Sequence, residues 1–174
     1  MPFTLSDTEP VLIGNKLYVF RGTSTTNGIY DISANTWSTF SITVGSGSQT
    51  SYSLIGAAIY YDNIDTIYFF KNKLWVKLTL STMTLTELSY NTAESAGAIS
   101  SARYFIRKID DNRLAYIKSN SMSIINLSEL TCKVVLSQYF NPICDYDDKS
   151  ILCWYANTSE SYKQYNSLSI VKYK

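Results

Sequence analysis

The chain contains no histidine, and this absence restricts the chemistry that its side chains can perform. Histidine is the commonest general base and the commonest metal ligand, and the serine–histidine and cysteine–histidine forms of catalysis both require it. A phosphate-binding loop is not indicated either, because no lysine follows Gly45 and Gly47 in the required pattern. We therefore predict a protein that is not an enzyme, with no catalytic residue, no bound metal and no cofactor.

Carboxylates can act without histidine, so a hydrolase that uses only carboxylates is a remote alternative. Six of the fourteen acidic residues, however, cluster in short segments between hydrophobic runs, namely Asp62, Asp65, Asp110, Asp111, Asp147 and Asp148. Aspartate favours turns because its side chain bonds to the backbone close by in the sequence. We therefore interpret these residues as parts of turns.

Two of the three cysteines flank a predicted turn at residues 147–150. In a regular hairpin with this turn, residue 146 pairs with residue 151, and Cys144 then stands opposite Cys153. A cross-strand disulfide can form in that arrangement. Because cytosolic cysteines are usually reduced, two buried thiols are the preferred alternative. Cys132 is expected in the core.

Charge and termini restrict the partners and the location of the protein. The formal net charge of +1 provides no basic surface for nucleic acid. The first residues lack the basic start and apolar run of a secretory signal, and no segment is long and apolar enough to span a membrane. We expect synthesis in the cytoplasm. The low charged fraction of 17% is also typical of proteins packed into assemblies, so incorporation into a virion or another particle is considered.

A divergent repeat indicates an all-β fold. Fifteen tyrosines, seven phenylalanines and three tryptophans favour strands. Residues 15–22, 65–72, 112–119 and 149–156 each read as a turn residue followed by a hydrophobic run. Residues 30–40, 78–88 and 125–135 form a second block in which Ser33, Ser81 and Ser128 coincide, as do Thr36, Thr84 and Thr131. Each second block predicts two strands joined by a two-residue turn.

Further strands are predicted before the first blocks, at residues 11–13, 57–60, 103–106 and 143–146. Four strands in each repeat predict a small four-bladed β-propeller with four antiparallel strands per blade. The blades cover about 10–42, 54–90, 102–137, and 142–174 plus 2–6, within one domain over residues 1–174. Residues 2–6 resemble a fourth strand, so the N-terminal strand would complete the last blade and close the ring. A β-sandwich with an accidental repeat is the alternative.

Two of the blades resemble known repeats. Residues 11–22 together with 29–37 resemble a kelch repeat, and residues 67–75 resemble a hemopexin repeat. Hemopexin domains have four blades, as predicted for this chain. Of the paired glycines of kelch repeats only Gly22 is present, and no cysteine lies near the N-terminus for the hemopexin disulfide. Both families are mainly binding modules, and the resemblance implies a binding function.

The long connections are the candidate binding site. In a propeller the connections 21–28, 43–53, 89–101 and 155–166 lie on one face, and long loops on a rigid scaffold commonly carry binding. They are rich in Tyr, Ser and Asn, as antibody loops are. The candidate binding residues on this long-loop face are Arg21, Tyr52, Tyr90, Glu94, Tyr162, Lys163 and Tyr165. Loops that are only solvated are the alternative.

The expected partner is another protein or a second copy of the chain. A lectin-like module that binds glycans is the alternative function. Repeated glycan sites should place the same exposed aromatic residue in each blade, and the loops contain no such repeat. This favours a protein partner over a glycan.

Overall fold

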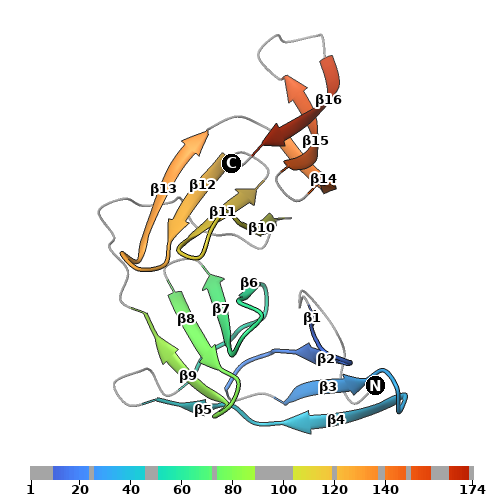
Figure 1. Ribbon diagram of the computed structural model, residues 1–174, viewed down its shortest axis with the longest axis vertical. Coiled ribbons are helices and arrows are strands. Elements are labelled where there is room, and N and C mark those ends of the chain that lie inside the picture. The colour runs from blue at the N-terminus through green and yellow to red at the C-terminus, as the bar shows by residue number, and fades with distance from the viewer. Residues whose placement is uncertain are drawn as a thin grey trace. The chain divides into compact units, whose positions relative to one another are not determined.

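The computed structural model describes residues 10–23, 26–45, 51–71, 74–88, 104–118, 121–136, 140–147, 150–157 and 165–172. The regular structure in these residues consists of strands, so the predicted all-β class is confirmed (Figure 1). None of the described residues belongs to a helix that is long and apolar enough to cross a membrane. The strands fall into two compact units, one with β1 to β9 and one with β10 to β16. The single domain stays a prediction.

The first sheet is an antiparallel meander in chain order. It consists of β1 (Pro10–Ile13), β2 (Lys16–Val19), β3 (Asn27–Asp31) and β4 (Thr36–Phe40). Alternate residues of a strand belong to opposite faces. Val11, Tyr18 and Phe40 therefore pack into the core with the second sheet, while Leu12, Leu17 and their cross-strand neighbours form the other face.

The second sheet repeats this order and gains one short strand. It contains β6 (Ala58–Tyr61), β7 (Thr66–Lys71), β8 (Leu74–Thr79) and β9 (Thr84–Glu87), with β5 (Thr43–Val44) beside β9. The pairing of β5 with β9 is parallel. Because β5 comes from the segment that leaves the first sheet, that segment covers an edge which would otherwise expose unpaired backbone groups.

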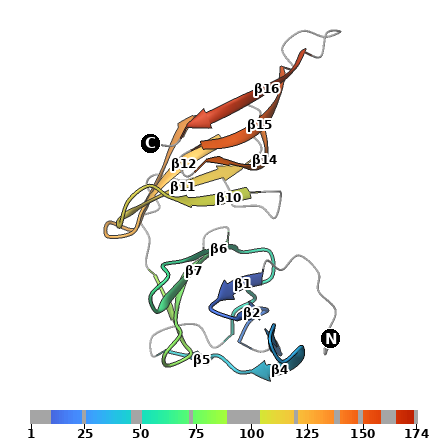
Figure 2. The same ribbon diagram turned by 45° about the vertical axis from the view of Figure 1, so that its right-hand side comes forward.

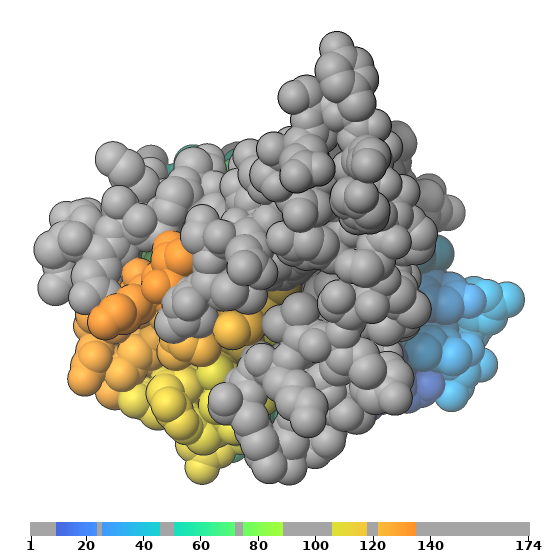
Figure 3. Space-filling model, turned by 90° about the horizontal axis from the view of Figure 1, so that it is seen from above, coloured from blue at the N-terminus to red at the C-terminus, as the bar shows by residue number. Residues whose placement is uncertain are grey.

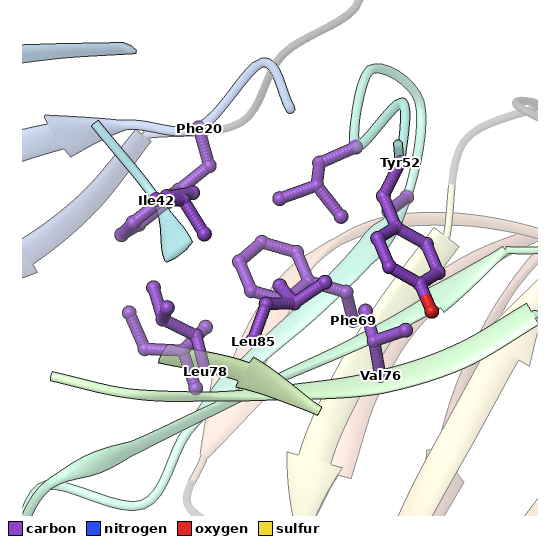
Figure 4. Packing of buried hydrophobic residues seen from close by; sticks show 10 residues of the cluster. Phe20, Ile42, Tyr52, Phe69, Val76, Leu78 and Leu85 are labelled. Atoms are coloured by element: carbon purple, nitrogen blue, oxygen red, sulfur yellow. The ribbon is translucent and has the colours of Figure 1, made fainter. Parts of the chain in front are cut away.

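Apolar side chains from both sheets of the first unit form one core. Figure 4 shows Phe20 and Ile42 facing Phe69, Leu78 and Leu85. The rings of Phe20 and Phe69 meet edge to face, with centroids 5.3 Å apart. Burial of one such side chain contributes about 1.5–3 kcal/mol, so this core supplies the main force that joins the two sheets.

The second unit contains two more sheets. One has β10 (Tyr104–Lys108), β11 (Arg113–Lys118), β12 (Ser121–Asn126) and β13 (Thr131–Leu136), and the other has β14 (Phe140–Asp147), β15 (Ser150–Asn157) and β16 (Tyr165–Lys172). The last three strands lie side by side in Figure 2. The coloured residues of β10 to β13 form a continuous yellow and orange surface in Figure 3. Strand β11 contacts β14.

The strand order of the sheets follows the predicted repeat, but the turns between the paired strands of the second blocks are longer than predicted. Asp31 pairs with Thr36, so four residues rather than two form the first of these turns, and the same holds between Thr79 and Thr84 and between Asn126 and Thr131. The last residue of each turn has a positive φ, 52° for Asn35, 50° for Met83 and 52° for Leu130. A left-handed residue reverses the chain at the end of such a turn, and side chains other than Gly can adopt it at a cost of about 1–2 kcal/mol.

Candidate functional site

Asp62, Asp65 and Asp110 accept hydrogen bonds from the backbone of their own turn or of a neighbouring turn, as the sequence predicts, whereas Asp111 pairs with the side chain of Lys108. Asp62 Oδ1 accepts hydrogen bonds from the amides of Ile64, Asp65 and Thr66 at 2.8, 3.1 and 3.0 Å. Asp110 accepts from the amide of Arg113 at 2.8 Å and from its guanidinium at 2.7 Å. The hydrogen bond from Arg113 lowers the pKa of Asp110 below its ordinary value. These carboxylates are therefore committed to local structure.

A polar contact, which we call the turn latch, recurs in three sheets. In each case the residue just before β2, β7 or β11 forms a hydrogen bond with the serine in the four-residue turn that follows the next strand. The pairs are Asn15 with Ser33 (2.7 Å), Asp65 with Ser81 (2.6 Å) and Asn112 with Ser128 (2.9 Å), and in each sheet the backbone carbonyl of the same residue also accepts from the amide before the serine. The coinciding serines were visible in the sequence, but their partners were not identified from it.

Tyr52, a predicted binding residue, belongs to the core. Its side chain is only 2% exposed, and Figure 4 shows its ring among the apolar residues. Its hydroxyl donates to Glu87 Oε2 at 2.7 Å. Its ring therefore offers no surface to a partner. The sequence prediction failed at this residue because the Ser-rich surroundings of Tyr52 suggest a solvated loop, whereas the pairing that buries it comes from residues about thirty positions earlier.

Two of the predicted long connections meet at their bases. Leu54 donates its amide to the carbonyl of Arg21 at 3.0 Å, and Thr23 donates to the carbonyl of Tyr52 at 3.0 Å. Gly22 pairs with Ser53 in an isolated antiparallel bridge. The described parts of the connections at 21–28 and 43–53 therefore lie next to each other.

The buried Asn27 completes this junction. Its Oδ1 accepts from the amides of Arg21 at 2.7 Å and Gly22 at 3.1 Å, and its Nδ2 donates to the carbonyl of Gly22 at 2.9 Å. Gly22 has a φ of 148°, and a Cβ at this position would lie 2.1 Å from the carbonyl oxygen of Tyr52. Only glycine fits there, because the two backbones approach too closely for a side chain.

The other predicted binding residues are placed only in part. Arg21 is half-buried, and its backbone forms the junction just described. Tyr165 is the first residue of β16 and pairs with Asn157. Tyr90, Glu94, Tyr162 and Lys163 lie outside the described residues, as do residues 2–6, the proposed closing strand.

A row of large side chains crosses the face of the first sheet that points away from the core, and sequence reasoning missed it. Leu12 pairs with Leu17, Leu17 with Tyr30, and Tyr30 with Trp37. We call these four residues the outer row. Leu12 is 57% exposed, and the rings of Tyr30 and Trp37 have centroids 5.2 Å apart. The alternation of the predicted strands contained this signal.

The register of the last hairpin differs from the prediction. Cys144 pairs with Leu152, and Cys153 pairs with Pro142, because the ladder shifts register at two irregularities. The two cysteines are therefore not directly opposite one another. The disulfide between them stays a prediction. Cys132 is buried, as expected.

Comparison with known proteins assigns no family. No family model matches the chain, and no curated protein matches it. Among solved structures, the extracellular domain of a hybrid two component system from B. thetaiotaomicron is similar to it, with 14% sequence identity and a TM-score of 0.46. That match covers 100% of this chain and 23% of the other. Within the described residues no three His, Cys, Asp or Glu side chains are grouped so as to hold a metal ion.

Proposed function

We propose that the chain is a non-catalytic binding module whose partner is another protein or a second copy of the chain. The observation that carries this proposal is the junction at the base of two long connections. Gly22, Asn27 and the backbone at Tyr52 hold both connections on a buried scaffold. Loops that start from a fixed base lose less conformational entropy on binding than free loops do.

The proposed module is a closed four-bladed propeller in which residues 2–6 complete the last blade. Two observations support this arrangement. The last sheet has three strands in the described residues, whereas the first and third have four. Leu12, on the outer face of the first sheet, is 57% exposed, and a neighbouring blade would cover it.

The proposed binding surface is the long-loop face without Tyr52. It includes Arg21, Tyr90, Glu94, Tyr162, Lys163 and Tyr165. Tyrosines supply large contact areas at low entropic cost. The protein would act as an adaptor or as a component of a larger particle such as a virion, after synthesis in the cytoplasm.

The test is the native mass of the full chain by size-exclusion chromatography with light scattering at several concentrations, with identification of co-purifying proteins. We expect a discrete complex or concentration-dependent association. The triple variant Tyr162→Ala, Lys163→Ala, Tyr165→Ala should lose it. The matched control is Lys108→Ala with Asp111→Ala, which removes an exposed ion pair of 2.6 Å in a short turn and should keep the complex.

A complex that survives the triple variant, or a monomer at every concentration, would contradict the proposal. The monomer would then be applied to a glycan array. Glycan binding that the triple variant abolishes would support the lectin-like alternative in place of a protein partner.

A further inference from the structure

The hairpin of β14 and β15 contains three registers within one ladder, separated by two irregularities. Next to the turn, Asp147 pairs with Ser150. Beyond an irregularity at residues 145–147, Asp145 pairs with Ile151 and Cys144 with Leu152. If the turn register continued without that irregularity, residue 146 would pair with 151, residue 145 with 152, and Cys144 with Cys153. The two cysteines are therefore one register step away from facing each other.

Only the shifted register suits a disulfide. Directly opposite residues in an antiparallel pair have Cα atoms about 4.5–5.5 Å apart, which lies within the span of about 4.4–6.8 Å that a disulfide bridges. In the observed register Cys144 is opposite Leu152, and successive positions of a strand belong to opposite faces. Cys144 and Cys153 are then not on a common face, so the bond requires the one-residue shift.

The position of β14 makes such a shift feasible. The sheet order is β14, β15, β16, so within the described residues β14 is an edge strand that is hydrogen-bonded only to β15, although it also contacts β11. A shift therefore alters one ladder and leaves the pairing of β15 with β16 intact. Pro142 lies beside the second irregularity, and it has no amide hydrogen to donate to the ladder. A bulge also stores the extra residue that the shift requires.

We propose that this hairpin is a redox-sensitive register switch. With both thiols reduced, Cys144 stands opposite Leu152. A small-molecule disulfide converts it to the shifted register by thiol–disulfide exchange. One cysteine thiolate attacks the small disulfide and releases one thiol, and the second cysteine then attacks the mixed disulfide and releases the other. Two cysteine thiols are oxidised to one disulfide, while one small disulfide is reduced to two thiols. This inference does not depend on the proposed binding function.

The first test exposes the full chain to oxidised glutathione, followed by peptide mapping and NMR. We expect a peptide that links Cys144 to Cys153 within one chain. Cross-strand contacts should change from residues 145 and 151 in the reduced protein to residues 146 and 151 in the oxidised one. An oxidised protein that keeps the reduced contacts, or one that carries only mixed or intermolecular disulfides, would overturn the switch.

The second test changes the length of the bulge. Deletion of Tyr146 removes the residue between Asp145 and Asp147, so that Cys144 stays opposite Leu152 without the irregularity next to the turn. Disulfide formation should slow by about tenfold or more, because the bond geometry is lost. Tyr146→Ala keeps the chain length and should oxidise at the wild-type rate. Equal rates for the deletion and the substitution would count against the proposal, and the NMR contacts decide the question if the deletion variant does not fold.

Discussion

Gly22 shows how one residue type determines a connection between two sheets. Its backbone bridges to Ser53, while its neighbours Arg21 and Thr23 bond to the backbone at Leu54 and Tyr52. The close approach leaves no room for a Cβ atom. The glycine that resembled a kelch glycine in the sequence therefore has a local physical reason to be present.

Gly22→Ala should destabilise the protein strongly. The added methyl group would lie 2.1 Å from the carbonyl oxygen of Tyr52, so the bridge must open, at an expected cost of more than about 3 kcal/mol in the free energy of unfolding. Gly14→Ala is the matched control. Gly14 also has a positive φ, 57°, but nothing lies within 4 Å of its Cβ position, so about 1–2 kcal/mol is expected. If urea denaturation gives equal losses of unfolding free energy for the two variants, the close approach of the backbones at Gly22 and Tyr52 does not matter for stability.

Tyr116 should make stability depend on pH in the alkaline range. Burial, with a smaller contribution from Cys132, raises the pKa of Tyr116 above its ordinary value of 10.0. Above pH 10.0 the unfolded chain therefore releases a proton that the folded chain keeps, and stability falls by up to about 1.4 kcal/mol per pH unit. Below that pH the contribution is fully present. Denaturation of wild type and Tyr116→Phe from about pH 8 to about pH 11 tests this, because the variant should lose less stability. Parallel pH profiles would contradict it.

At the scale of the element, the turn latch explains why three hairpins share one geometry. Each latch joins the residue before one strand to the turn after the next strand. It therefore determines where the first strand starts and where the second one ends. Two positions after each serine, a residue has the left-handed backbone conformation. A repeat that has diverged in its apolar residues has therefore kept the polar contact that determines its turns.

Asp65→Ala, Asn15→Ala and Asn112→Ala should each destabilise the protein by about 1–2 kcal/mol, because each removes hydrogen bonds to a turn. For Asp65 these are the amide of Ser81 at 2.7 Å and its hydroxyl at 2.6 Å. Asp111→Ala is the control. The side chain of Asp111 is 97% exposed and pairs only with Lys108 among the described residues, so less than about 0.5 kcal/mol is expected. If thermal unfolding shows that Asp111→Ala destabilises the protein as much as the other three variants do, the latch does not have the proposed role.

At the scale of the whole molecule, the outer row distinguishes a closed ring from separate sheets. The side chain of Leu12, on the first sheet, is 57% exposed. A neighbouring blade that covers the row would bury Leu12, and a charge would then be costly there.

Leu12→Asp should lower the free energy of unfolding by more than about 2 kcal/mol if the propeller is closed. Ile64→Asp is the matched control, since Ile64 is 83% exposed in a short turn of the second sheet and should change stability by less than about 0.5 kcal/mol. Deletion of residues 1–6 should open the ring and lower the free energy of unfolding of the wild type. In that shortened chain, Leu12→Asp should cause no further loss of stability. A Leu12→Asp variant as stable as Ile64→Asp would argue against closure.

The sequence by itself determined the all-β class, the approximate positions of the described strands other than β5, the repeated order of strands and the use of aspartates in turns. These features depend on alternation and on turn chemistry, which act over a few residues. The tertiary structure decided that Tyr52 is a core residue, that the turns contain four residues, and that Cys144 pairs with Leu152. Each of these depends on backbone or side-chain partners from another strand or connection, and a local pattern cannot specify which partner a residue meets when the chain folds.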